Sequence, residues 1–458
     1  ACPTMVAVAA PTFPEVTPEV VDRYDISAPR YTSYPTVPHW TRDFTARNRV
    51  QALERVAPGE PISVYAHIPF CERRCRYCGC NVVIARDRGK GTAYIDRLLR
   101  EVELTAAWMK GPQTAALHLG GGTPTFLPPA ELRRLTDGLL SYFPRVEGAE
   151  LSLEVDPAMV TREQLETLVD LGYRRISFGV QDLHPSVLEI VGRPGQDVIL
   201  AQRLAEAREV GFTSVNFDLI YGLPGQTRES WTRTLELILG MAPDRLAIYG
   251  FAFLPDQRPN QRSLKKWARP EGADKLALLA QAHQRLVREG YVAVGMDHFA
   301  RPDDALAQAA AKGTLSRNFQ GYTPISGMDT VSFGMSAISD VGGAFFQNPA
   351  TVAEYAEEVD TGRLRPARGW LRTDDDHRRE KIIRALMCQG RAEWGPEERQ
   401  HFAAEGRRLR DPELRGLVEI QDDALVLTPL GLVFPRNVAR IFDAYIPAGG
   451  ETRYSRTV

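Results

Sequence analysis

Between residues 62 and 290 the chain alternates short apolar runs with longer amphipathic segments. The apolar runs predict buried strands, and the segments with apolar residues three and four positions apart predict helices. The strands and the helices that follow them form six pairs: 62–68 and 94–109, 115–120 and 129–143, 150–156 and 161–172, 174–180 and 197–211, 214–222 and 228–241, and 245–254 and 272–290.

This alternation predicts an α/β fold, a parallel sheet with crossover helices. Eight such units close a full barrel, so six predict an incomplete (β/α)6 barrel, about three-quarters of a ring. Chemistry in such folds lies at the carboxyl ends of the strands. Thr161 is placed to cap the third helix, and Gly211 to end the fourth.

The segments on either side of this region show a different pattern of residues. The first part is rich in turn formers, and residues 374–390 and 417–446 predict a helix followed by strand, turn, strand and a final helix. We therefore expect an N-terminal extension (1–55), a barrel domain (56–364) and a small, mainly helical C-terminal domain of winged-helix character (365–458). Its mixed charge favours a lid or packing role over DNA binding.

Composition excludes several classes of protein. The 458 residues are 43% hydrophobic and 25% charged, with a net charge of −2, so no general attraction to nucleic acid or to anionic membranes is expected. No apolar run reaches the roughly 18–20 residues that span a bilayer. The start of the chain has no cationic segment before an apolar run, so we expect no secretory signal and a cytoplasmic location.

Four of the six cysteines lie in "CERRCRYCGC", at residues 71, 75, 78 and 80. A structural zinc site prefers two separate CxxC pairs, and a redox dithiol leaves two of these cysteines unexplained. The CxxxCxxC spacing lets three thiolates converge on one iron–sulfur cluster, so it favours Cys71, Cys75 and Cys78 as ligands. Cys80 lies only two residues after Cys78, too close along the chain to reach the fourth corner of a cluster held by the other three cysteines. We therefore expect Cys80 not to bind iron. Cys388 reads as a buried helix residue.

Further motifs occur in a fixed order along the chain: "PRYTSYPT", "YAHIPFCERRCRYCGCN", "HLGGGTPTFL", "LEVDP", "SFGVQDLHPSVLEIVGR", "NFDLIYGLPGQT", "GMDHFARPDD", "RNFQGYT" and "GMSAIS". CxxxCxxC after a first strand is the signature of radical S-adenosylmethionine (SAM) enzymes. From about residue 24 to the C-terminal "YSRTV", the chain resembles the oxygen-independent coproporphyrinogen III oxidases of that superfamily.

The resemblance implies a fold of radical SAM type and a reaction. A [4Fe–4S] cluster with one open iron reduces SAM to a 5′-deoxyadenosyl radical, which takes hydrogen from a propionate of coproporphyrinogen III. Two oxidative decarboxylations then give protoporphyrinogen IX, a step of haem biosynthesis. It also implies a monomer and a one-electron reductant such as flavodoxin or ferredoxin.

The resemblance further implies two SAM sites. Tyr77 either lies against the adenine of SAM or packs beside the cluster. The glycine run, Gly120–Thr123, either holds the amino-acid end of SAM with its backbone or is a tight turn between strand and loop. Glu154 alternatively reads as a solvated strand-end acid. The implied contacts to the first SAM are Tyr65, Gly121, Gly122, Thr123, Glu154, Ala252 and Ile338, and those to the second are Gln181, Arg193 and Asp218.

The substrate carries four propionates, and arginine binds carboxylates with two parallel hydrogen bonds. Arg30 and Arg317 are therefore candidates for substrate binding. His298 reads equally as a proton donor or as a hydrogen-bonded core residue, and Cys80 is a weak catalytic candidate.

One departure from the family keeps alternatives open. Phe253 stands where the family commonly has histidine, which removes a donor and an acceptor. The alternatives are a related radical SAM C-methyltransferase or cyclopropanase, and a haem-binding chaperone on the same scaffold. Cys80 argues against the chaperone, which usually lacks it.

Overall fold

The computed structural model describes residues 13–446 and 454–457. The secretory-signal prediction at the start of the chain, and Cys2, fall outside these residues. Within them, a twelve-stranded sheet forms the frame, in the order β16-β15-β14-β13-β1-β4-β5-β6-β7-β8-β10-β9. Its strands with parallel neighbours are β13 (Thr330–Phe333), β1 (Pro61–Ile68), β4 (Gln113–Gly121), β5 (Arg145–Val155), β6 (Arg175–Gln181), β7 (Ser214–Tyr221) and β8 (Arg245–Gly250).

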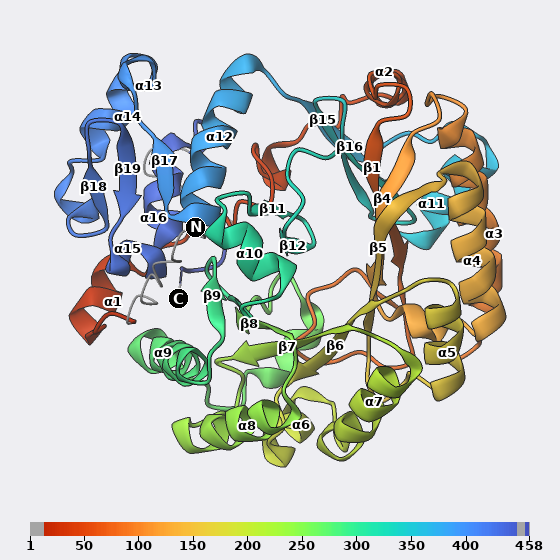
Figure 1. Ribbon diagram of the computed structural model, residues 1–458, viewed down its shortest axis with the longest axis horizontal. Helices are drawn as coiled ribbons and strands as arrows, with labels where there is room; N and C mark the ends of the chain where they lie inside the picture. The colour runs from red at the N-terminus through yellow and green to blue at the C-terminus, as the bar shows by residue number, and fades with distance from the viewer. Residues whose placement is uncertain (1–12, 447–453, 458) are drawn as a thin grey trace, which may run out of the picture.

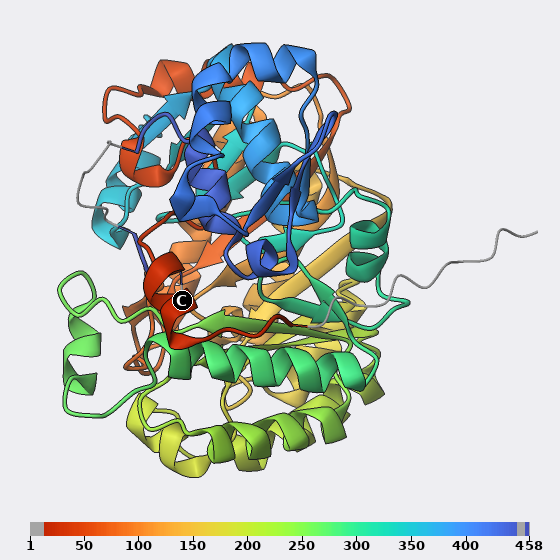
Figure 2. The same cartoon turned by 90° about the vertical axis from the view of Figure 1, so that its left-hand side faces the viewer.

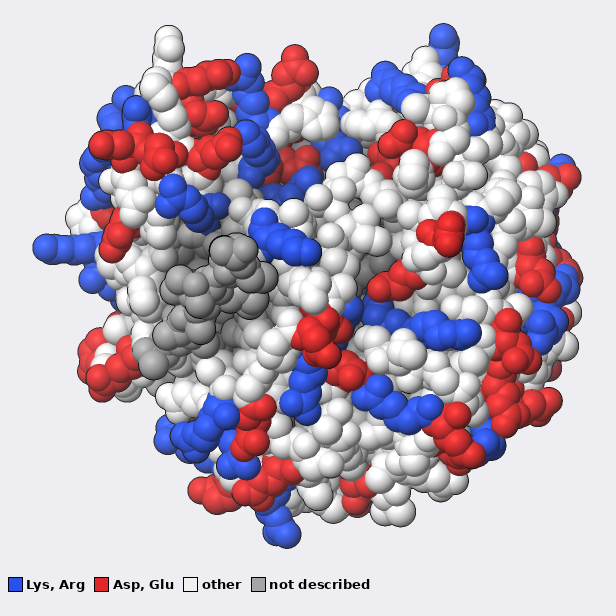
Figure 3. Space-filling view, in the orientation of Figure 1, with Lys and Arg blue, Asp and Glu red and all other residues white. Residues whose placement is uncertain are grey.

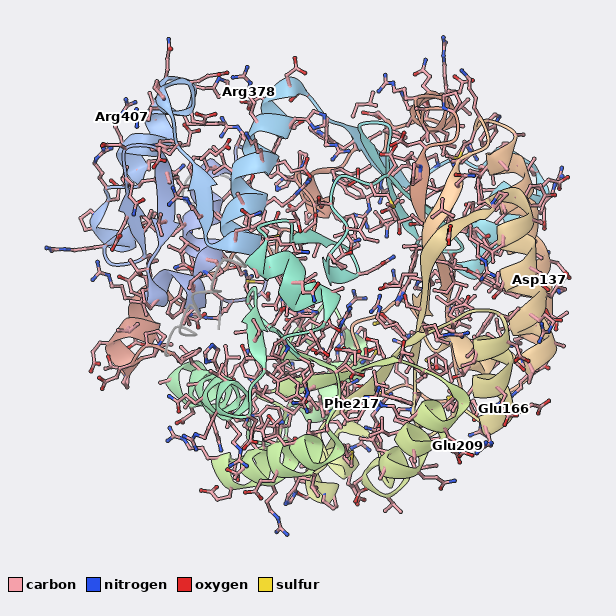
Figure 4. The ribbon with its side chains drawn as sticks, viewed as in Figure 1. Asp137, Glu166, Glu209, Phe217, Arg378 and Arg407 are labelled. Atoms are coloured by element: carbon pink, nitrogen blue, oxygen red, sulfur yellow. The ribbon has the colours of Figure 1, made fainter. Side chains whose placement is uncertain are left out.

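Six long helices cover the outer face of these strands (Figure 1). They confirm all six predicted strand–helix pairs. Asp137, Glu166 and Glu209 extend from the outer surface of three of them (Figure 4). The helices are α3 (Gly89–Ala106), α4 (Pro129–Tyr142), α5 (Arg162–Asp170), α7 (Gln196–Val210), α8 (Arg228–Met241) and α9 (Gly272–Arg288).

The ring of strands stays open, as predicted. β8 pairs antiparallel with β10 (His298–Ala300), and β10 pairs with β9 (Val292–Val294), so β8 does not return to β1. On the other side, β1 pairs with β13 and the sheet continues through β14 (Ile338–Val341), β15 (Ala344–Gln347) and β16 (Arg368–Leu371).

Local signals for helix ends are confirmed at two positions. Thr161 caps α5 by accepting a hydrogen bond from the Gln164 backbone N–H, and the Gln164 side chain accepts from Thr161 in return. Gly211 ends α7 with φ 117°, a left-handed conformation that glycine adopts without steric cost.

Along the strands, side chains that pack under the helices alternate with side chains that face the interior of the ring. In β4, Leu117 and Leu119 are fully buried, whereas His118 lines the interior. In β5, Leu151 and Leu153 are buried, and Glu154 faces inward. Successive side chains of a strand point to opposite faces, so one face packs on the helices and the other forms a polar cavity.

The C-terminal part contains a three-stranded sheet, β17-β19-β18, packed with short helices. The predicted strand–turn–strand is confirmed, but the single final helix is wrong, because Pro435 starts a new helix where its ring prevents continuation. Its elements are α12 (Asp374–Gln389), β17 (Arg391–Glu393), α13 (Pro396–His401), α14 (Ala403–Arg408), β18 (Val418–Ile420), β19 (Ala424–Leu427), α15 (Pro429–Val433), α16 (Pro435–Ala439) and the 3-10 turn Arg440–Phe442.

Segments from the two ends of the chain lie side by side. Ser27 forms a β-bridge with Arg456, and α1 (Pro18–Tyr24) packs against α9, as Figure 2 shows. The remaining α-helices and strands are α2 (Ala46–Glu54), β2 (Phe70–Cys71), β3 (Val83–Ile84), α6 (Pro185–Val191), α10 (Ala305–Ala311), β11 (Ser316–Asn318), β12 (Gly321–Thr323) and α11 (Val352–Asp360). The other 3-10 helices are Val37–His39, Pro124–Phe126, Pro259–Leu264 and Pro412–Leu414.

Over the part of the chain that the structure describes, no helix is both apolar enough and long enough to cross a bilayer. Basic and acidic side chains are interspersed over the face shown in Figure 3.

Candidate active site

A cavity of about 560 Å³ opens inside the ring, at the carboxyl ends of the strands. It brings together most of the side chains that the sequence analysis singled out. Those that line it are Cys71, Cys75, Tyr77, Cys78, Cys80, Gly121, Gly122, Thr123, Glu154, Gln181, Arg193, Asp218, Ala252 and His298. Tyr65, Ile338, Arg30 and Arg317 are not among the lining residues.

The cysteine loop (residues 71–80) lies between β2 and β3, which pair with each other outside the twelve-stranded sheet, and its four cysteines form no disulfide. The Cys80 backbone N–H donates to the Cys78 sulfur at 3.4 Å. Hydrogen bonding from Cys80 lowers the pKa of Cys78 to about 6, whereas burial raises the pKa of Cys71 to about 12. Cys78 is thus prepared for the thiolate form that binds metal.

The loop's donor chemistry fits an iron–sulfur cluster: three sulfurs at CxxxCxxC spacing face one cavity. Among the described residues, no group of three His, Cys, Asp or Glu side chains is already arranged to hold a metal ion. The fit therefore rests on ligand type and on the shared cavity wall rather than on preformed coordination.

Two residues far along the chain hold the backbone of this loop. The Asn260 side-chain nitrogen donates to the carbonyl oxygens of Cys75, Arg76 and Cys78 at 3.2, 3.1 and 3.0 Å. The Gln261 side-chain nitrogen donates to the carbonyl oxygen of Tyr77 at 2.8 Å. Sequence reasoning missed both, because "PNQR" has no spacing pattern that relates it to the cysteines.

Arg193 lies against the cysteine loop. Its Nε donates to the Cys75 sulfur at 3.2 Å, and its guanidinium forms an ion pair with Asp156 at 2.9 Å. Both side chains of this pair are over 90% buried. In this structure the guanidinium therefore neutralises charge beside the cysteine loop, while it also lines the cavity.

The glycine run after β4 passes close to other backbone. A Cβ at Gly122 would lie 2.6 Å from the Phe70 carbonyl oxygen and 2.7 Å from that of Pro69, too close for any other residue. Gly121 has φ 116° and its N–H donates to Glu154 at 3.4 Å. The run is therefore required by close packing against the segment that leads into the cysteine loop.

Glu154 carries a negative charge into the cavity. Desolvation opposes ionisation, but His118, whose Nε2 lies 3.6 Å from the carboxylate, and the Gly121 N–H outweigh this and lower the pKa of Glu154. The Tyr65 ring stacks on His118 with centroids 6.0 Å apart, so Tyr65 supports the glutamate through the histidine. His118 was not among the predicted site residues.

Asp218 faces the same cavity from β7. Ser177 donates to it at 2.9 Å and Asn216 at 2.9 Å. Burial, with the nearby charge of Glu154, raises the pKa of Asp218 to about 6. Gln181, at the end of β6, has φ 68°, a strained conformation for a residue with a Cβ.

The remaining candidates converge on Asp297, which the sequence analysis missed. His298 donates through Nδ1 at 2.7 Å, while Arg317 and Arg30 lie 3.8 and 3.6 Å away. Burial opposes ionisation of Asp297, but Arg317 and His298 outweigh it and hold its pKa well below the usual range. Because the carboxylate accepts, His298 carries its proton on Nδ1 and turns the other nitrogen away from Asp297.

Three further predicted positions are placed as follows. Ala252 lines the cavity, and its carbonyl oxygen accepts from Gln261 at 3.1 Å. Ile338 begins β14, and its carbonyl oxygen accepts from Ser332 at 2.5 Å. Cys388 is buried in α12, as expected of a structural helix residue.

The chain is similar to known proteins over most of its length. The Radical SAM superfamily model matches residues 65–238. The "Oxygen-independent coproporphyrinogen III oxidase" of Escherichia coli is 40% identical over 434 residues, 93% of this chain and 95% of its own. The protein of the same name from Pseudomonas aeruginosa is 36% identical over 451 residues, 96% of this chain and 98% of its own.

Similarity to a solved structure agrees with the similarity of sequence. The coproporphyrinogen III oxidase of Escherichia coli, described as a radical SAM enzyme, superposes with a TM-score of 0.87 at 38% identity, over 91% of this chain and 97% of that one. The fold and the cysteine-lined cavity are thus those of the radical SAM class. Within that class, the chain belongs to the oxygen-independent coproporphyrinogen III oxidase family.

Proposed function

We propose that this chain catalyses the anaerobic oxidative decarboxylation of two propionates of coproporphyrinogen III, giving protoporphyrinogen IX. The observation that carries the proposal is 40% identity to a named relative over 93% of the chain, together with the cysteine loop and glycine run on one cavity. The alternatives of a methyltransferase, a cyclopropanase or a haem-binding chaperone are not favoured by these relatives.

The cysteine loop is the proposed cluster site. Cys71, Cys75 and Cys78 supply three thiolates, and Cys80 acts through its hydrogen bonding to Cys78. When bound, a [4Fe–4S] cluster and SAM supply the one-electron chemistry that generates a carbon radical. Asn260 keeps the loop closed, and Arg193 offsets negative charge at Cys75.

The cavity walls offer groups suited to SAM. The glycine run presents backbone at its edge, and ionised Glu154 attracts the ammonium and sulfonium charges of a SAM molecule. Tyr65 and Ile338 support this wall, and Tyr77 and Ala252 provide apolar lining. A second SAM is proposed at the polar side chains of Gln181, Arg193 and Asp218, which line the same cavity.

His298 and the charged residues around it are suited to proton exchange with the substrate and to binding of its carboxylates. Asp297 holds the proton on Nδ1 of His298, which leaves the other ring nitrogen as the site for proton exchange. Arg317 and Arg30 bring positive charge to the same carboxylate. Their surplus charge is suited to propionates of the substrate.

We further propose a monomer that receives electrons from flavodoxin or ferredoxin and acts in the cytoplasm. The unpaired, clustered cysteines support a reducing compartment. The division at residues 55/56 and 364/365 is likewise a proposal, as is the lid or packing role of the C-terminal domain. It is supported by the separate three-stranded sheet β17-β19-β18.

The test is an anaerobic assay with coproporphyrinogen III, SAM and a one-electron reductant. We expect protoporphyrinogen IX with methionine and 5′-deoxyadenosine; a methylated product or haem binding without turnover would refute the proposal. Iron and sulfide content should be lost on changing Cys71, Cys75 or Cys78 to Ala, and retained in Cys80→Ala.

A further inference from the structure

A second cavity, of about 510 Å³, lies behind the strand-end segment that borders the first one. Residues 250–252 and Leu254 line both cavities, so this segment is their common wall. The other walls are the start of α9, the N-terminal arm near Arg30, and residues 454–457. Of the residues that line this space, the function proposed above uses Arg30 and Ala252 and leaves the others without a role.

The second cavity has a surplus of positive charge. The cations in its walls are Arg30, Arg269, Lys275, Arg436 and Arg456, and the acids are Asp22, Asp25 and Glu271. Arg456 pairs with Asp25 and Arg269 with Glu271. Within residues 13–446 and 454–457, Lys275 and Arg436 form no ion pair. Arg30 pairs with Asp297, a carboxylate that also pairs with His298 and Arg317.

Lys275 is held in place for binding. Its stem passes over Gly222 and Gly250, where an added Cβ would lie 2.9 and 3.5 Å from its Cε. Its Nζ donates to the Phe251 carbonyl oxygen at 2.9 Å, the one hydrogen bond it makes to a described residue. An ammonium has three N–H donors, so two remain for a ligand.

Arg30 also keeps its donors available. It makes an ion pair at 3.6 Å but no hydrogen bond to any residue the structure describes, and 36% of its side chain is exposed. Arg436 donates hydrogen bonds to the carbonyl oxygens of Ala28, Pro29 and residues 455 and 456. These bonds hold the N-terminal segment that contains Arg30 in place. Arg436 thus adds charge and position rather than free donors.

Lys275 and Arg436 have no ion-pair partner among the described residues, and both are repelled by the positive charge of Arg30. Burial, together with Arg30, lowers the pKa of Lys275 to about 8 and that of Arg436 to about 9. An anion between Arg30 and Lys275 removes this repulsion, and a carboxylate matches their donors. The first turn of α9 adds the positive end of its dipole at Gly272.

We propose that this second cavity binds a non-reacting propionate of the tetrapyrrole substrate, through Arg30 and Lys275. The proposal rests on the function proposed above, in which the reacting propionate occupies the first cavity. Phe253 lines the second cavity, with Arg269 4.0 Å above its ring. The replacement of the family's common histidine therefore lies on the wall of this cavity, where Phe253 also packs against the hydrophobic cluster that Tyr77 of the cysteine loop contacts.

The experiment uses the reconstituted full-length protein with Lys275→Met and Arg30→Gln. The control is Lys110→Met, an exposed lysine outside both cavities. Binding of coproporphyrin III, the stable oxidised analogue, is measured by fluorescence titration at two salt concentrations. KM for coproporphyrinogen III, the Kd of SAM, iron content and Tm are measured in parallel.

We expect each variant to weaken coproporphyrin III binding and raise KM about tenfold, with a smaller salt dependence and an unchanged Kd for SAM. If the wild type turns over and both variants bind the porphyrin as it does, the cavity proposal fails while the enzyme function stands. If the variants change only the affinity for SAM, the second cavity binds the carboxylate of SAM rather than a propionate, and the cavity proposal is overturned. A wild type without turnover overturns both proposals.

Discussion

Replacing Asn260 by aspartate removes the side-chain donor that holds the cysteine loop, while the size and shape of the side chain stay the same. The amide nitrogen serves three carbonyl oxygens at 3.0–3.2 Å, and its own oxygen is buried without a hydrogen-bond partner in the described part of the chain. The aspartate oxygen accepts rather than donates, so three loop carbonyls lose their partner.

The expected cost follows from that geometry. The three hydrogen bonds are part-buried or exposed, so their loss costs less than at a fully buried site, but the new carboxylate also repels the carbonyl oxygens, which brings the expected cost to about 1–3 kcal/mol. One factor of ten in an equilibrium is about 1.4 kcal/mol, so the closed loop is disfavoured by roughly 5- to 150-fold. We expect Asn260→Asp to lose its cluster faster and to hold less iron after reconstitution.

The assay is anaerobic reconstitution followed by iron and sulfide analysis and the rate of cluster loss to an iron chelator. Gln261→Glu, which removes the donor to Tyr77, should act in the same direction. Asn48→Asp is the matched control, since toward described residues the Asn48 side chain only accepts hydrogen bonds, at its oxygen, near the start of α2. Wild-type cluster retention in Asn260→Asp, with a lowered Tm, would show that these bonds support the fold alone and refute the reasoning.

The remaining predictions concern stability, measured by denaturant unfolding. Arg49→Met leaves fully buried Glu101 without its 2.9 Å ion pair and should cost about 3–5 kcal/mol; a loss below 1 kcal/mol contradicts the role of this pair. The pKa of Asp218 is raised to about 6 in the folded protein, so the unfolded chain ionises at lower pH. Stability relative to Asp218→Asn should therefore fall by about 2 kcal/mol as pH rises from 4 to 6, and parallel pH profiles would rule this out. Gly122→Ala forces a Cβ against the backbone of Pro69 and Phe70, so it should lower the free energy of unfolding by about 1–3 kcal/mol and weaken SAM binding. The control is Gly240→Ala, whose Cβ meets no atom within 4 Å and which should be neutral or slightly stabilising. Equal effects of the two substitutions would argue against the close approach at Gly122.

Much of the barrel was predictable from local pattern. Each strand and helix of the six pairs depends on apolar spacing within its own segment, and the cap at Thr161 depends on a residue three positions away. The spacing of Cys71, Cys75 and Cys78 is equally local. α6, between β6 and α7, and the break before Pro435 were missed, because short helices carry too few turns for periodicity to show.

The sequence by itself determined the order of the strands and helices, the open ring and the chemistry of the cysteine loop, since these depend on neighbours along the chain. Only the tertiary structure decided that Asn260 clamps a loop over 180 residues away, and that Arg30 and Arg317 meet His298 at Asp297. It also decided that Lys275 stands with Arg30 in a second cavity. Such contacts join residues through the path of the folded chain, and no spacing along the sequence encodes them.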